Sequence, residues 1–181
     1  MFRSYYFGWP TIRAGIAGLA MVLCLPMIPT SAQTELELRE SHDAAGVFAE
    51  KVEALIADLP VERERFEVRI NRCQGARGEM RDDIYAVWVG VRLTAENGDA
   101  GAVLTAAVAD WRERGWEIFR DRVLDNGGVN IAALDPSSGE SHSLDSGFKR
   151  DPHRYIVGYF STPCLQDPSG AAPFGSVFPE Q

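Results

Sequence analysis

Alternating apolar residues mark the clearest strand of the chain, residues 84–93. The residues that recur at every second position are Tyr85, Val87, Val89, Val91 and Leu93. Because successive side chains of a strand point to opposite faces, these five would share a buried face, while Trp88 and Arg92 would lie on the other. The pattern predicts a strand that is covered on one side only.

A helical pattern follows over residues 100–114. Its apolar residues, at i, i+3 and i+4 spacing, are Val103, Leu104, Ala107, Val108 and Trp111. Asp99 can cap the first turn, and Gly115 can take the left-handed conformation that ends a helix, which leaves Trp116 to fold back on the last turn. We expect Trp111 and Trp116 to pack in the core, because aromatic residues at helical spacing usually face a sheet.

Before the central strand, the sequence predicts one helix and one strand. The apolar face of the helix, residues 41–59, consists of Ala44, Phe48, Val52, Leu55 and Leu59. Pro60 ends this helix. Residues 66–73 alternate apolar and polar side chains, and a loop over residues 74–83 would join them to residues 84–93 as an antiparallel hairpin.

Four further strands are predicted after the second helix, at residues 116–123, 129–134, 141–148 and 155–162. Turns rich in Gly, Asn, Asp and Pro separate them. The segment 141–148 is polar, so we expect it at an edge. The order α-β-β-α-β-β-β-β predicts an α+β fold, a two-layer sandwich in which both helices cover one face of a mostly antiparallel sheet.

Residues 1–32 have the pattern of an export signal. Two arginines precede the apolar run 14–25, and small residues precede a cleavage point after Ala32. Lipidation at Cys24 and retention as an anchor are alternatives, but Leu23 is a poor residue before a lipidated cysteine, and the run is shorter than the ~20 residues that span a bilayer. We therefore predict a secreted or extracytoplasmic protein, bound to a membrane only if the signal is retained or lipidated.

After the signal we expect an acidic lead-in at residues 33–40, a single domain at residues 41–164 and a tail at residues 165–181. The tail combines proline and glycine with no periodicity, which predicts disorder. Cleavage would remove two arginines and no acid, leaving 16 basic against 26 acidic residues, a net charge of −10. Such a charge argues against nucleic acid as the partner.

Two cysteines, Cys73 and Cys164, would remain after cleavage. In a chain sent to an oxidising compartment they predict an intramolecular disulfide, which would join the first strand to the end of the last. No Cys-x-x-Cys spacing supports a redox pair instead.

The layout of these elements resembles that of small exported or lipid-anchored actinobacterial proteins of unknown function. The resemblance is carried by Cys73, by Gly115-Trp116 after the helix and by Pro163-Cys164 at the end, and covers about residues 41–164. Its motifs are structural. The resemblance therefore implies no catalytic residue for this chain.

Candidate catalytic residues are scarce. Ser141, His142, Ser143 and Asp145 are close in sequence, but alternate residues of one strand cannot converge as a catalytic triad does. No metal-ligand spacing supports a site at His142, Asp145 and His153. We predict no catalytic residue, metal or cofactor. A small cell-envelope hydrolase that uses His142 or His153 with nearby carboxylates is the alternative.

The sheet face opposite the helices is the candidate recognition surface. It would carry Trp88, Arg69, Asn71 and Arg92 and, depending on register, either Tyr155 and Tyr159 or Ile156 and Phe160. Tryptophan and arginine often anchor interfaces. We predict an exported non-enzymatic domain that binds a protein or a cell-envelope component through this face around Trp88. A solvated face with an incidental tryptophan, or a structural accessory of the cell wall, would account for the same pattern.

Overall fold

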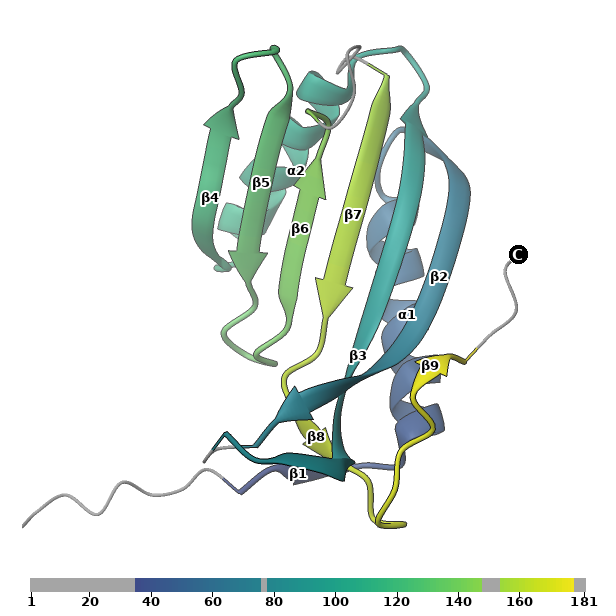
Figure 1. Ribbon diagram of the computed structural model, residues 1–181. Helices are drawn as coiled ribbons and strands as arrows, with labels where there is room; N and C mark the ends of the chain where they lie inside the picture. The colour runs from purple at the N-terminus through teal and green to yellow at the C-terminus, as the bar shows by residue number, and fades with distance from the viewer. Residues whose placement is uncertain (1–34, 76–77, 148–153, 178–181) are drawn as a thin grey trace, which may run out of the picture. The chain divides into compact units, whose positions relative to one another are not determined.

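A computed structural model describes residues 35–75, 78–147 and 154–177 of the chain. These ranges contain two helices and nine strands (Figure 1). In chain order the elements are β1 (Glu37–Leu38), α1 (Ser41–Ala57), β2 (Val61–Gln74), β3 (Met80–Ala95), α2 (Ala100–Glu113), β4 (Glu117–Val123), β5 (Val129–Leu134), β6 (Ser141–Asp145), β7 (Tyr155–Ser161), β8 (Leu165–Gln166) and β9 (Gly175–Ser176). The expected signal, residues 1–32, lies outside the described residues.

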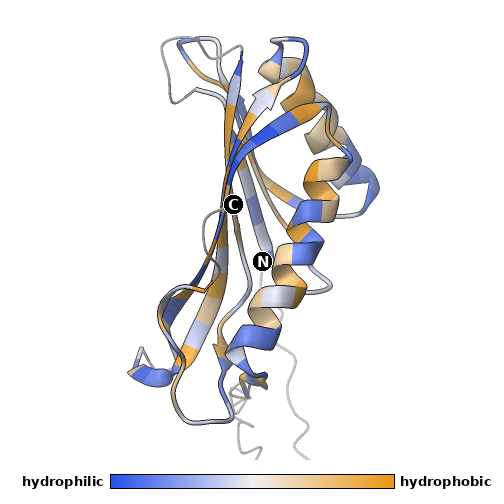
Figure 2. Ribbon diagram, turned by 90° about the vertical axis from the view of Figure 1, so that its right-hand side faces the viewer, coloured by the Kyte–Doolittle hydropathy of each residue, from blue (hydrophilic) through white to orange (hydrophobic). Residues whose placement is uncertain are grey.

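The strands form one mixed sheet. Across the sheet, the order of hydrogen-bonded strands is β9-β2-β3-β7-β6-β5-β4. The short strand β8 pairs with the same edge of β3 as β7 does, at residues nearer the start of β3. Neighbouring strands are antiparallel except β1 and β8, which are parallel. Figure 2 views the sheet nearly edge-on, with α1 and α2 on the same side of it. The fold is therefore α+β, dominated by the sheet.

The expected helix-first order is not confirmed. The strand β1 precedes α1, and β8 and β9 follow β7. Each of these three strands is two residues long. A strand of two residues leaves no alternating pattern in the sequence, because one period of a strand already takes two residues.

Both helices begin with a capped first turn. In α1 the Glu40 side chain accepts a hydrogen bond from the Asp43 backbone N–H, and in α2 the Asp99 side chain does the same for Ala102. The predicted end of α2 is confirmed: Gly115 has φ 78°, and the Trp116 N–H donates to the carbonyl of Trp111 over 2.9 Å.

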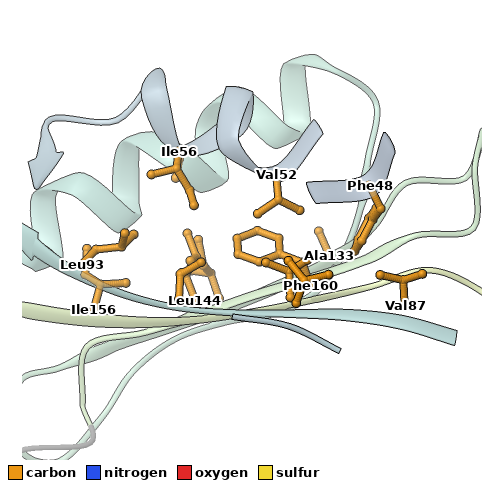
Figure 3. Packing of buried hydrophobic residues seen from close by; sticks show 14 of the residues in the cluster. Phe48, Val52, Ile56, Val87, Leu93, Ala133, Leu144, Ile156 and Phe160 are labelled. Atoms are coloured by element: carbon orange, nitrogen blue, oxygen red, sulfur yellow. The ribbon is translucent and has the colours of Figure 1, made fainter. Parts of the chain in front are cut away.

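The core lies between the helices and the sheet (Figure 3). From α1, Phe48, Val52 and Ile56 point toward the sheet residues Leu144 and Phe160. The predicted apolar face of β3 is confirmed, because its five alternating residues are all at most 4% exposed. Burial of this stripe is the main hydrophobic contribution of the central strand.

Two strand predictions need correction. The hairpin of β2 and β3 is longer than expected, since β2 begins at Val61 and β3 already at Met80. The polar strand β6 is not an edge strand: it pairs with β5 on one side and β7 on the other. Its inward residues His142 and Leu144 are buried, and its outward residues Ser141, Ser143 and Asp145 are polar and partly exposed.

The segment 165–177, predicted as part of a disordered tail, is ordered. Cys164 forms the predicted disulfide with Cys73, with Cα atoms 5.8 Å apart. Three residues later, the Asp167 carboxylate accepts a hydrogen bond of 2.9 Å from the Ser41 backbone N–H at the start of α1. The segment then pairs with β2 through β9. These tertiary contacts hold the segment in place although its sequence has no periodic pattern.

Candidate functional site

The sheet face turned away from the helices is built by the register of β2, β3 and β7. Trp88 lies opposite Arg69 of β2, and Gly90 lies opposite Tyr159 of β7. The register therefore places Tyr155 and Tyr159 on this open face, while Ile156 and Phe160 face the helices and are buried. No helix or strand of the described ranges lies over this side of the sheet (Figure 2).

Trp88 and Tyr159 form an aromatic platform on the open face. Their ring centroids are 5.6 Å apart and their planes are tilted by 30°. Gly90 makes room for the indole, since a Cβ there would lie 2.3 Å from the Trp88 ring. Trp88 thus lies along the sheet over Gly90, and Tyr159 beside it is 48% exposed. The two rings present apolar surface outward.

Charged residues border the aromatic platform. Glu67 lies between two arginines of its own strand, 3.3 Å from the Arg65 guanidinium and 3.1 Å from that of Arg69. Arg92 lies directly opposite Arg65 in the register and is exposed. Within the described ranges, the Arg92 guanidinium has no ion-pair or hydrogen-bond partner. The cross-strand pair Arg65–Arg92 therefore brings like charges together, which is unfavourable without a counter-charge.

A depression of about 240 Å³ lies at this place. Its side-chain lining comes from Arg65, Glu67, Trp88, Arg92, Val157 and Tyr159. Of the four predicted binding residues, Trp88 and Arg92 therefore line it. Arg69 lies outside it and beside Trp88, held by Glu67, and Asn71 lies further along β2, opposite Ala86.

Sequence reasoning missed Arg65 and Glu67. The run of alternating charges from Glu62 to Arg69 looked like a solvated, self-neutralising segment, and the ion pairs of Glu67 agree with that interpretation. The signal that could have found them is strand periodicity, because both residues have the same parity as Arg69 once β2 is extended to Val61.

On the other half of the open face, formed by β4, β5 and β6, polar side chains hydrogen-bond to one another. Asn130 accepts from the Arg120 guanidinium at 3.2 Å and donates to the Asp145 carboxylate at 2.6 Å. Asn130 is only 5% exposed although it is on this face. Its polar groups are thus satisfied internally.

The alternative site around His142 lies on the opposite face, in the core. The imidazole stacks on Trp116 at 4.3 Å and lies 5.7 Å from Phe160, and its side chain is 0% exposed. Burial, followed by the positive charge of Lys51, lowers the pKa of His142 to about 4, although Asp135 acts in the other direction. The residue is therefore a neutral, buried imidazole at physiological pH.

The residues beside His142 do not form a hydrolytic site with it. Ser141 and Ser143 lie on the other face of β6, where Ser141 shares a hydrogen bond of 2.8 Å with Ser161. The Glu140 carboxylate is 3.9 Å from the imidazole and instead accepts a hydrogen bond from Lys51 at 2.5 Å. His153, the other histidine of the hydrolase hypothesis, lies outside the described residues.

The described residues contain neither a metal-binding cluster nor a membrane-spanning helix. Among residues 35–75, 78–147 and 154–177, no group of three or more His, Cys, Asp or Glu side chains is placed to hold a metal ion. Neither helix in this part of the chain is long and apolar enough to cross a membrane.

Comparisons of the chain with protein-family models, with curated proteins and with solved structures find no match. The resemblance to exported actinobacterial proteins therefore stays a prediction.

Proposed function

We propose that the protein is an exported, non-enzymatic domain that binds a protein or cell-envelope component through the open sheet face around Trp88. The observation that carries this proposal is the partly exposed aromatic platform beside Arg92. Surface aromatic and arginine side chains that lie together, with polar groups around them, are typical anchors of recognition surfaces. We further propose that the fold is a two-layer sandwich, in which the helices cover one face of the sheet and leave the other face open for binding.

Extracytoplasmic location is part of the proposal. The Cys73–Cys164 disulfide is compatible with it, because disulfides persist in oxidising compartments and are rare in the cytosol. The export pattern of residues 1–32 supports the same location. The acidic composition favours a soluble domain.

Site-specific photo-crosslinking in the natural host tests the proposal. A benzophenone amino acid replaces Tyr159 on the platform or, as a control, Phe119 on β4, which is 58% exposed. We expect covalent adducts of defined mass from position 159 and none from position 119. Equal adducts from both positions, or none from position 159, would contradict a binding role for this face.

A further inference from the structure

The pairing of Arg65 with Arg92 points to an anionic ligand. Arg65 already contacts Glu67, whereas Arg92 has no partner within the described ranges. Arg92 thus places at the depression a positive charge that no side chain of the described ranges neutralises. Arginine binds carboxylates with paired, charge-assisted hydrogen bonds. A carboxylate of the ligand would supply the missing counter-charge.

The aromatic platform adds a second requirement. The Trp88 and Tyr159 rings have centroids 5.6 Å apart and planes tilted by 30°, and they lie beside Arg92. Such a surface suits a ligand that is flat and has C–H groups on one side, since the negative face of an aromatic ring attracts them. A sugar ring meets this description and carries its hydroxyl groups around its edge.

The backbone around the depression disfavours a peptide that binds by adding a strand to the sheet. At Gly90, β3 is paired with β2 on one side and with β7 on the other, so its main-chain groups are used within the sheet. A peptide strand would need free main-chain groups at a sheet edge. Recognition here has to come from side chains alone.

We infer that the depression binds a carboxylate-bearing saccharide, such as a uronic acid unit, with the carboxylate at Arg65 and Arg92 and the sugar ring on Trp88 and Tyr159. The inference rests on the proposed function and names the ligand class of the same surface. A short acidic unit fits better than a long polyanion, because the net charge of −10 outside residues 1–32 repels extended anions.

Isothermal titration calorimetry with the protein purified from its host tests the inference. The probes are trigalacturonate and trimannuronate, with their methyl esters and hexaglutamate as comparisons. We expect at least one uronide to bind, its ester to bind at least about tenfold more weakly, and the affinity to fall as salt is raised. Equal binding of acid and ester would overturn the inference, and hexaglutamate binding as tightly as the uronides would assign the surface to acidic peptides instead.

Variants locate the binding. Arg92→Gln should weaken uronide binding at least about tenfold, and Trp88→Ala about three- to tenfold. The matched control Arg122→Gln removes another exposed arginine, on β4, and should leave the affinity unchanged. An equal loss in the control would contradict the site. If no probe binds while crosslinks at position 159 persist, the saccharide inference fails and the proposed function stands.

Discussion

The described residues include an aromatic cluster on each face of the sheet, and the two clusters differ in what surrounds them. Trp111, Trp116 and His142 are packed between α2 and the sheet, and His142 is fully enclosed. Trp88 and Tyr159 lie on the other face, where Tyr159 is half exposed. Burial therefore separates a cluster that packs in the core from one that is open to solvent.

The largest expected difference concerns Trp111. Because this residue is 5% exposed and contacts the core, Trp111→Ala should lower the free energy of unfolding by about 3–5 kcal/mol. Urea denaturation followed by far-UV circular dichroism measures the loss. The conservative Trp111→Phe should lose clearly less, and a loss below about 1 kcal/mol in Trp111→Ala would show that the inner cluster is not structural.

The pH dependence of stability should come next in size. The unfolded chain binds a proton at His142 near pH 6.5, whereas the folded chain does so only near a pKa of about 4. Stability should therefore fall by about 3 kcal/mol as the pH drops from 6.5 to 4. His142→Phe should remove this loss while the exposed His42→Gln retains it; an unchanged pH profile in His142→Phe would contradict the assignment.

Asp167 should have a smaller effect, which is structural and separate from the binding face. Burial raises the pKa of Asp167, but hydrogen bonds from Ser169 and Ser41 outweigh it and lower the pKa to about 2. Asp167→Ala should destabilise the protein by about 1–3 kcal/mol, because the buried Ser41 N–H loses its acceptor. Hydrogen exchange should show faster exchange at the start of α1 and in residues 165–172. Protection that matches the wild type would contradict this anchoring role.

The smallest effect on stability is expected at Trp88. Trp88→Ala should change the free energy of unfolding by less than about 1 kcal/mol, since Trp88 lies on a partly exposed surface and belongs to no buried cluster. The same denaturation assay measures it. A loss as large as that of Trp111→Ala would erase the distinction between the two clusters.

Part of the fold and of the open face could be predicted from the sequence. Strong periodicity predicted α1, α2 and the buried stripe of β3, and the placement of Trp88 and Arg92 on the open face followed from the same alternation. The register that selected Tyr159 depends on pairing between strands far apart in the chain. The order of residues 165–177 depends on a disulfide and on Asp167, and such tertiary contacts leave no local pattern to detect.

The most direct test of the central claim is hydroxyl-radical footprinting of the protein in its host and in purified form. Tyr159 and Phe119 are both exposed, at 48% and 58%, but only Tyr159 belongs to the aromatic platform. Tyr159 and Trp88 should be labelled in the purified protein and protected in the host, while Phe119 should be labelled equally in both. Equal labelling of Tyr159 in the two samples would contradict the claim that the open face is a binding surface.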